Sequence, residues 1–200
     1  MSAAATHSAR IGLLFGSFNP IHTGHLILAQ YMATHTDLTE VWLIVSPQSP
    51  YKVSQDLLPE TIRLSLVEAA IAGNNRLRAV NVEFNLPKPN FTITTLDELR
   101  RLHPTNEFVL IMGGDNLLGL AGWKDTKRIQ GEFDIYVYPR PGYALPEVST
   151  GARLRIVTAP LLDISATFIR QSIRAGKSIR YLVSEVVEKQ IITNGYWQTQ

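Results

Sequence analysis

Short apolar runs alternate along this chain with segments in which apolar residues recur at helical spacing. Six runs have the length and composition of buried strands, at residues 11–15, 40–45, 77–84, 107–112, 134–138 and 154–158. Helices are predicted at residues 26–33, 60–72 and 93–102, from residues 116 and 166 onward, and around residues 183–191. This alternation predicts an α/β fold, a Rossmann-like, doubly wound and mostly parallel sheet with helices on both faces.

The same spacing predicts which helical residues are buried and where helices end. The predicted buried faces of two helices are Ile93, Leu96, Leu99 and Leu102 in one, and Val183, Val186, Val187 and Ile191 in the other. Gly176 and Gly195 are typical helix ends. The sequence contains no internal repeat or linker. We therefore predict one domain, residues 11–200, after a flexible N-terminal arm at residues 1–10.

Composition narrows the class of protein. The chain has 200 residues, 45% of them hydrophobic, with no cysteine and a net charge of +2. Its Lys and Arg form no basic stripe with interleaved aromatics, which disfavours nucleic-acid binding. No apolar run approaches the ~20 residues needed to span a bilayer. Because the N-terminus lacks the pattern of a signal peptide and cysteine is absent, we expect a cytoplasmic protein.

The most specific chemistry follows the first predicted strand. The range 16–20 is a cluster of turn residues, and His22 and His25 then stand three residues apart near the start of a helix. A strand, a glycine turn and a helix N-terminus together direct main-chain N–H groups at an anion, usually phosphate. Two imidazoles on one helical face can donate hydrogen bonds to the same phosphate. A capping role and zinc ligation are the alternatives, and the lack of cysteine and of an HExxH pattern disfavours zinc.

Three more candidate segments also follow predicted strands. Lys52 lies in a proline-containing loop, and Gly113 precedes Asp115, which either accepts hydrogen bonds from a ribose or caps the next helix. Ser165 is predicted to be an N-cap, with Arg170 one turn into the helix, an arrangement suited to a polyphosphate. Ligands of parallel sheets bind beyond the carboxyl ends of the strands, so these segments are expected to converge.

GSFNPIHTGHL resembles the (G)GTFDPxHxGH signature of the nucleotidyltransferase superfamily, and within it the chain is most similar to the bacterial nicotinate mononucleotide adenylyltransferases. The segment from Ile164 to Arg170 resembles the family's Ile-Ser-x-Thr-x-Ile-Arg motif in full, and the likeness covers nearly the whole chain. The chain departs from the family pattern at four positions, Phe15, Asn19, Tyr51 and Thr94.

The resemblance implies three sets of site residues. The implied catalytic set is His22, His25 and Arg170. The implied ATP-binding set is Gly16, Ser17, Phe18, Lys52, Gly113, Asp115, Ile164, Ser165 and Thr167. The implied acceptor-binding set is Asn19, Thr92, Trp123 and Arg140, and no side chain is expected to ligate a metal. On pattern alone, Thr92 and Thr95 could equally be helix caps.

The function that the resemblance implies is transfer of the adenylyl group of ATP to the phosphate of nicotinate mononucleotide, which yields nicotinate adenine dinucleotide and pyrophosphate. Mg²⁺ is expected to be bound through the ATP phosphates. Three alternatives stay open. The first is a related transferase, either an adenylyltransferase for nicotinamide mononucleotide or phosphopantetheine or a cytidylyltransferase. The second is a nucleotide-binding module without turnover, and the third is a zinc protein built on His22 and His25. The sequence fixes neither the oligomeric state nor the choice between nicotinate and nicotinamide.

Overall fold

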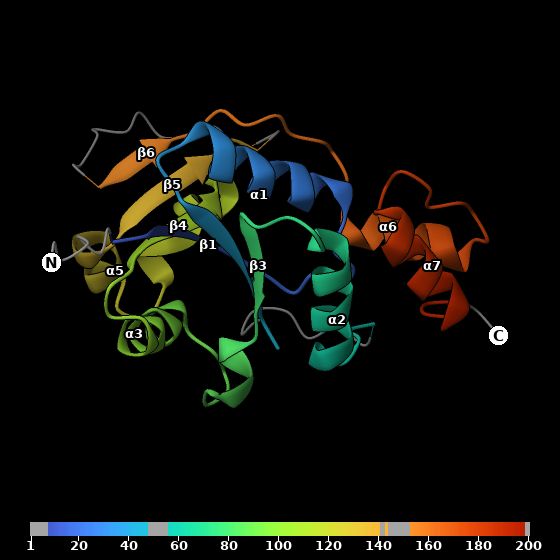
Figure 1. The fold of residues 1–200 in the computed structure, drawn as a ribbon, viewed down its shortest axis with the longest axis horizontal. Helices are drawn as coiled ribbons and strands as arrows, with labels where there is room; N and C mark the ends of the chain where they lie inside the picture. The colour runs from blue at the N-terminus through green and yellow to red at the C-terminus, as the bar shows by residue number, and fades with distance from the viewer. Residues whose placement is uncertain (1–7, 48–55, 141–142, 144–152, 199–200) are drawn as a thin grey trace, which may run out of the picture.

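The computed structural model describes residues 8–47, 56–140, 143 and 153–198. Strands and helices alternate along it (Figure 1). The strands are β1 (Arg10–Gly16), β2 (Glu40–Val45), β3 (Leu77–Val80), β4 (Glu107–Gly113), β5 (Asp134–Tyr138) and β6 (Leu154–Ile156). The α-helices are α1 (Thr23–His35), α2 (Glu60–Ile71), α3 (Thr92–Leu102), α4 (Gly114–Gly119), α5 (Thr126–Glu132), α6 (Ala166–Arg174) and α7 (Glu185–Thr193). Two short 3₁₀ helices are Val82–Asn85 and Leu120–Gly122.

All six strands form one parallel sheet in the order β3-β2-β1-β4-β5-β6. The chain first moves outward from β1 through β2 to β3, and then returns to the other side of β1 with β4. The strand order therefore reverses between β1 and β4, which is the switch point where such sheets bind ligands. This confirms the predicted Rossmann-like, doubly wound α/β fold.

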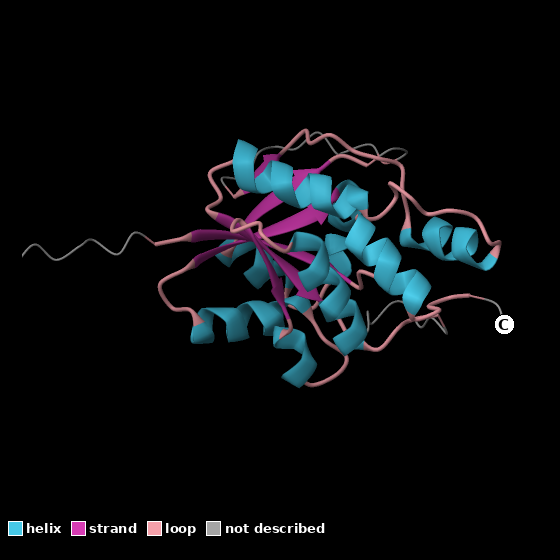
Figure 2. Ribbon diagram, turned by 45° about the vertical axis from the view of Figure 1, so that its right-hand side comes forward, coloured by secondary structure: helices cyan, strands magenta, loops and turns pink. Residues whose placement is uncertain are grey.

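Helices cover both faces of the sheet (Figure 2). Each face has its own apolar core. One core joins α1, α2, α6 and α7 to side chains such as Leu14 and Leu43, and the other joins α3 and α5 to Leu13 and Ile44. Neighbouring residues of a strand point to opposite faces, so Leu13 and Leu14 serve different cores. This explains why the strands read as continuous apolar runs rather than alternating ones.

Two helical residues predicted to be buried are exposed. Leu102 is 47% exposed, whereas Ile93 is 2% exposed. Three residues of an α-helix turn about 60° less than a full circle, so side chains spaced strictly by three move steadily away from one face. Val186 is 42% exposed for a similar reason, since Val187 occupies the buried face one position later. The predictions for Leu102 and Val186 were therefore wrong.

The predicted strand at residues 77–84 is also too long. The strand ends at Val80, and Glu83 lies in a 3₁₀ helix, 2% exposed, where its carboxylate accepts a hydrogen bond from the Thr95 hydroxyl at 2.7 Å. The Asn90 amide donates to the main-chain oxygen of Glu83. These partners come from α3 and from the loop before it, so contacts distant in sequence override the strand pattern.

Candidate active site

The candidate site begins where β1 and β4 end, at the switch point of the sheet. Gly16 is the last residue of β1 and Gly113 the last of β4, and the two strands are direct neighbours. A Cβ at Gly16 would lie 2.9 Å from the ring of Phe18, so only glycine leaves room for this ring. A Cβ at Gly113 would collide with the carboxylate of Asp115. The glycines thus let polar loops pack closely over the strand ends.

His22 and His25 form a stacked pair at the start of α1. The ring centroids lie 3.6 Å apart with the planes inclined by 23°, and Phe18 packs edge-on against His25 at 5.1 Å. The main-chain N–H of His22 donates to Nδ1 of His25 at 3.3 Å. Because Nδ1 of His25 is the acceptor, the neutral ring carries its proton on Nε2. His25 thereby presents one N–H donor on its side away from the His22 main chain.

The surroundings keep both imidazoles neutral. Burial, helped by the positive charge of Arg140, lowers the pKa of His22 to about 4. Burial also lowers the pKa of His25 well below its usual value, and the neighbouring His22 and Arg140 act in the same direction. His22 is 6% exposed, and its Nδ1 has no hydrogen-bond partner among the described residues. At neutral pH the pair therefore offers uncharged N–H donors, and the negative charge of a bound anion would raise the pKa of both rings.

The start of α6 lies against the turn that precedes the histidines. Ser165 is the N-cap of this helix, and its hydroxyl accepts a hydrogen bond from the Phe168 main-chain N–H at 3.1 Å, as the sequence predicts. Arg170 donates to the main-chain oxygen of Asn19 at 2.9 Å and to the Thr167 hydroxyl at 3.3 Å. Although burial lowers the pKa of Arg170, a guanidinium stays charged at neutral pH. Two segments about 150 positions apart thus meet at one turn.

Asn19 explains how the turn is held without the aspartate of the family pattern. The side chain is 3% exposed, its amide donates to the main-chain oxygen of Asp56 at 3.0 Å, and its carbonyl accepts the Leu58 N–H at 3.1 Å. An amide can make both bonds, whereas an ionised carboxylate could only accept. Asn19 therefore ties the turn after β1 to the segment that leads into α2.

A second group of predicted residues lies after β4 and β5. Arg140 forms an ion pair with Asp115 at 3.1 Å, and the two side chains are 49% and 26% exposed. The helix α4 begins at Gly114 with Gly113 as its N-cap, so the alternative role of Asp115 as the N-cap is wrong. The carboxylate points instead to the cation that lowers the pKa of both histidines.

The predicted acceptor residues Thr92 and Trp123 come from different elements that lie side by side. Trp123 packs against the core that contains α3, and the Lys124 ammonium lies 4.8 Å from the ring centre of Phe91, the residue before Thr92. Neither Thr92 nor Thr95 caps α3, because its N-cap is Phe91 and Thr95 bonds to Glu83. Lys52 lies outside the described residues.

Arg63 was not among the predicted site residues, although its side chain contacts the loops of the site. It lies in α2, is 0% exposed, and donates to the main-chain oxygens of Ser17, Ser46, Pro47 and Leu58. The only available signal was an arginine among the apolar positions of a helix, a pattern that usually places the charge in solvent.

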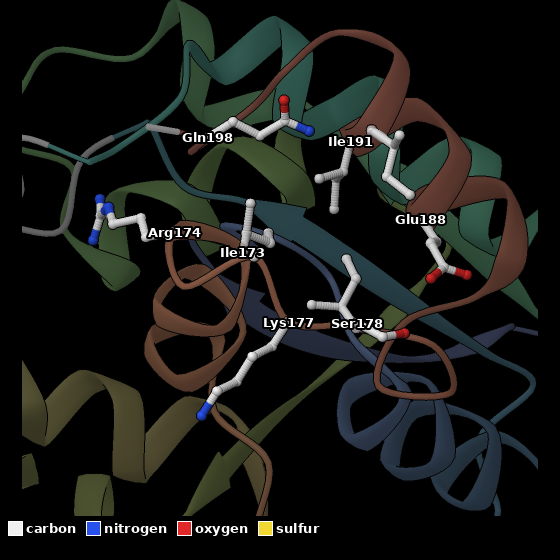
Figure 3. Close-up of a pocket in the computed structure, with 10 residues that line it drawn as sticks. Ile173, Arg174, Lys177, Ser178, Glu188, Ile191 and Gln198 are labelled. Atoms are coloured by element: carbon white, nitrogen blue, oxygen red, sulfur yellow. The ribbon is translucent and has the colours of Figure 1, made fainter. Parts of the chain in front are cut away.

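The described residues were also compared with the requirements of a metal site, a membrane helix and a ligand cavity. No group of three His, Cys, Asp or Glu side chains that could hold a metal ion occurs among the described residues. No helix in the described part of the chain is long and apolar enough to cross a membrane. A cavity of about 540 Å³ lies between α6 and α7, around Ile173 and Ile191 (Figure 3). None of the predicted site residues lines it.

Comparison with known proteins gives consistent matches over nearly the whole chain. Residues 13–172 match the family described as cytidylyltransferase-like. A protein of Cytophaga hutchinsonii named "Probable nicotinate-nucleotide adenylyltransferase" is 50% identical over 188 residues, which cover 94% of this chain and 98% of that protein. A Bacteroides fragilis protein of the same name is 43% identical over 183 residues, 92% of this chain and 91% of that protein.

Solved structures share the fold at lower identity. The nicotinic acid mononucleotide adenylyltransferase of Plasmodium falciparum, complexed with NaAD, superposes with a TM-score of 0.79 at 16% identity. The match covers 94% of this chain and 97% of that chain. At this identity the likeness supports the architecture alone.

Proposed function

This chain belongs to the cytidylyltransferase-like family of nucleotidyltransferases, and from this premise we propose that it transfers the adenylyl group of ATP to nicotinate mononucleotide. The products are nicotinate adenine dinucleotide and pyrophosphate, a step of NAD biosynthesis. The observation that carries the proposal is 50% identity to a relative named for this reaction, over 98% of that relative's length. The geometry adds support, because the two family motifs meet at the switch point of the sheet.

The proposed reaction is a direct displacement at phosphorus. An oxygen of the acceptor's phosphate forms a bond to the α-phosphorus of ATP, and the bond from that phosphorus to the bridging oxygen of pyrophosphate breaks. No protein nucleophile is needed, so the protein's work is to align two anionic groups and to stabilise charge on the equatorial oxygens. A site of uncharged N–H donors beside fixed cations suits that task, since the donors are oriented before the substrate arrives.

We assign the residues as follows. Nε2–H of His25 donates to an oxygen of the α-phosphate, and His22 lies beside it as the second donor. Arg170 holds the departing pyrophosphate from the start of α6, where the first main-chain N–H groups of the helix add a positive dipole end. Lys52 is expected to act with Arg170.

The remaining predicted residues divide between the two substrates. We propose that Gly16, Ser17, Phe18, Gly113, Asp115, Ile164, Ser165 and Thr167 form the ATP site. We propose that Thr92, Trp123 and Arg140 contact the acceptor, with the ring of Trp123 against its pyridine. Asn19 enters this set through the main chain only, because both ends of its side chain are already bonded to the protein.

Mg²⁺ enters this proposal as part of the substrate, bound to ATP oxygens. The described residues hold no protein cage of carboxylates, and Mg²⁺ commonly keeps waters and phosphate oxygens as its ligands. A cytoplasmic location, expected from the sequence, stays a prediction.

The decisive experiment measures pyrophosphate release from ATP and Mg²⁺ with nicotinate mononucleotide, nicotinamide mononucleotide or phosphopantetheine as the acceptor. We expect the highest kcat/KM with nicotinate mononucleotide and a dinucleotide product of matching mass. A preference for another acceptor would refute the assignment of substrate but keep the reaction class. ATP binding without pyrophosphate release from any acceptor would identify a nucleotide-binding module instead.

A further inference from the structure

Arg63 is a charged side chain sealed inside the protein beneath the candidate site. It is 0% exposed, and its guanidinium donates to four main-chain oxygens, those of Ser17 at 2.5 Å, Ser46 at 2.7 Å, and Pro47 and Leu58 at 2.8 Å. Ser17 follows β1, Ser46 follows β2 and Leu58 precedes α2. One planar group therefore joins the loop after β1 to both ends of the connection between β2 and α2, at the carboxyl edge of the sheet.

Among the residues that the structure describes, no carboxylate is bonded to the Arg63 guanidinium. No ion pair of Arg63 is found among the described residues, and Glu60 acts on it only at longer range. Burial lowers the pKa of Arg63, yet a guanidinium remains protonated at neutral pH. Burying an ion in this way is costly unless its donors are satisfied, and the four carbonyl oxygens do this. The positive charge that remains adds to the potential at the edge where phosphate is expected.

The loops that Arg63 holds are connected to the stacked histidines. Ser17 is followed by Phe18, whose ring packs edge-on against His25. Leu58, whose carbonyl binds the guanidinium, gives its own N–H to the side chain of Asn19. A shift of the guanidinium would thus move both the turn before the histidines and the segment that braces this turn.

We propose that Arg63 is a positioning residue of the transferase, which fixes the main chain after β1 and β2 so that its polar groups face the triphosphate of ATP. Only a guanidinium fits this task, because its N–H groups diverge in one rigid plane toward separate acceptors, whereas lysine offers a single point of charge. The inference rests on the proposed function, since the triphosphate is the ligand of that function.

The test compares Arg63→Lys with Arg63→Gln, and uses Leu66→Ala as the matched control. Leu66 lies three residues further along α2, is 1% exposed and packs in the apolar core with no polar group to bond the loops, so its truncation destabilises the same helix without removing a hydrogen bond. At a temperature at which all variants are folded, we expect kcat/KM for ATP to fall about 10²-fold in Arg63→Lys and further in Arg63→Gln, as for other displacements near 1 Å. Leu66→Ala should stay near the wild type. A loss in Leu66→Ala equal to that in Arg63→Lys would overturn the proposal.

Hydrogen exchange separates failure of this inference from failure of the proposed function. In the free protein, main-chain amides of residues 16–19 and 56–58 should exchange faster in Arg63→Lys than in Leu66→Ala, whether or not wild type releases pyrophosphate. Equal exchange would refute the positioning role even in an active enzyme.

A measurement on the wild type covers the case in which the Arg63 variants do not fold. The Nε–H resonance of Arg63 should be protected from exchange and should shift when a non-hydrolysable ATP analogue binds. No shift on saturation with the analogue would exclude coupling to the triphosphate.

Discussion

His25 offers the sharpest test of the proposed chemistry, because the structure fixes which proton its ring can donate. Its Nδ1 accepts the main-chain N–H of His22, so the donor is Nε2–H. Replacement by asparagine keeps an acceptor near the position of Nδ1 but places no donor where Nε2 stood. Replacement by glutamine places an amide N–H near Nε2. The two variants therefore test separately the acceptor at Nδ1 and the donor at Nε2 of the His25 ring.

The expected magnitude follows from the loss of one oriented donor to a developing oxyanion. Such a loss lowers kcat by about 10²–10³, or about 2.7–4 kcal/mol of transition-state stabilisation. Loss of the ring contacts with His22 and Phe18 costs about 0.5–1.5 kcal/mol each, which is less than the stability of an ordinary domain, so the variants should fold.

The assay is kcat for pyrophosphate release at saturating ATP and nicotinate mononucleotide, with thermal melting of each variant as the control for folding. We expect His25→Asn to lose about 10²–10³ in kcat with a small change in KM, and His25→Gln to lose about tenfold. If His25→Asn turned over at the rate of the wild type, the donor role of Nε2 would be refuted. If both variants fell equally, the N–H position would not be the property that matters.

Three further predictions test other parts of the site. Because the pKa of His22 is low, the unfolded chain binds a proton between about pH 6.5 and about pH 4 that the folded chain does not, so the free energy of unfolding falls over this range by at most about 3 kcal/mol. Urea unfolding should show a smaller fall in His22→Asn, and an equal fall would refute this linkage. Ser165→Ala removes the cap of α6 and should cost about 1 kcal/mol of unfolding free energy, while Ser165→Gly costs a few tenths; no difference from the wild type in urea would show that the cap contributes nothing. Trp123→Ala should raise KM for the acceptor at least tenfold and leave KM for ATP nearly unchanged, and an equal rise in both would contradict its place on the acceptor side.

For several predicted site residues, the structure confirms the local structural feature that the sequence predicted. Ser165 caps α6 because its hydroxyl needs only the N–H three residues later, and such a bond can be read from four consecutive positions. Gly16 and Gly113 mark strand ends for an equally local reason. The roles of these residues toward a ligand stay predictions, and the position of Lys52 lies outside the described residues.

By itself the sequence determined the alternation of strands and helices, and hence the parallel sheet, since hydrophobic periodicity acts over one element at a time. It also placed His22 and His25 at the start of a helix, where His22 is the N-cap of α1 and His25 lies in the first turn. Only the tertiary structure decided that Arg63 is buried, that Thr95 bonds to Glu83 and that Asn19 braces the loop before α2. The partners of these polar groups are carbonyls, carboxylates and N–H groups from other segments. A buried polar side chain is stable only once folding brings such partners to it, and no local pattern specifies them.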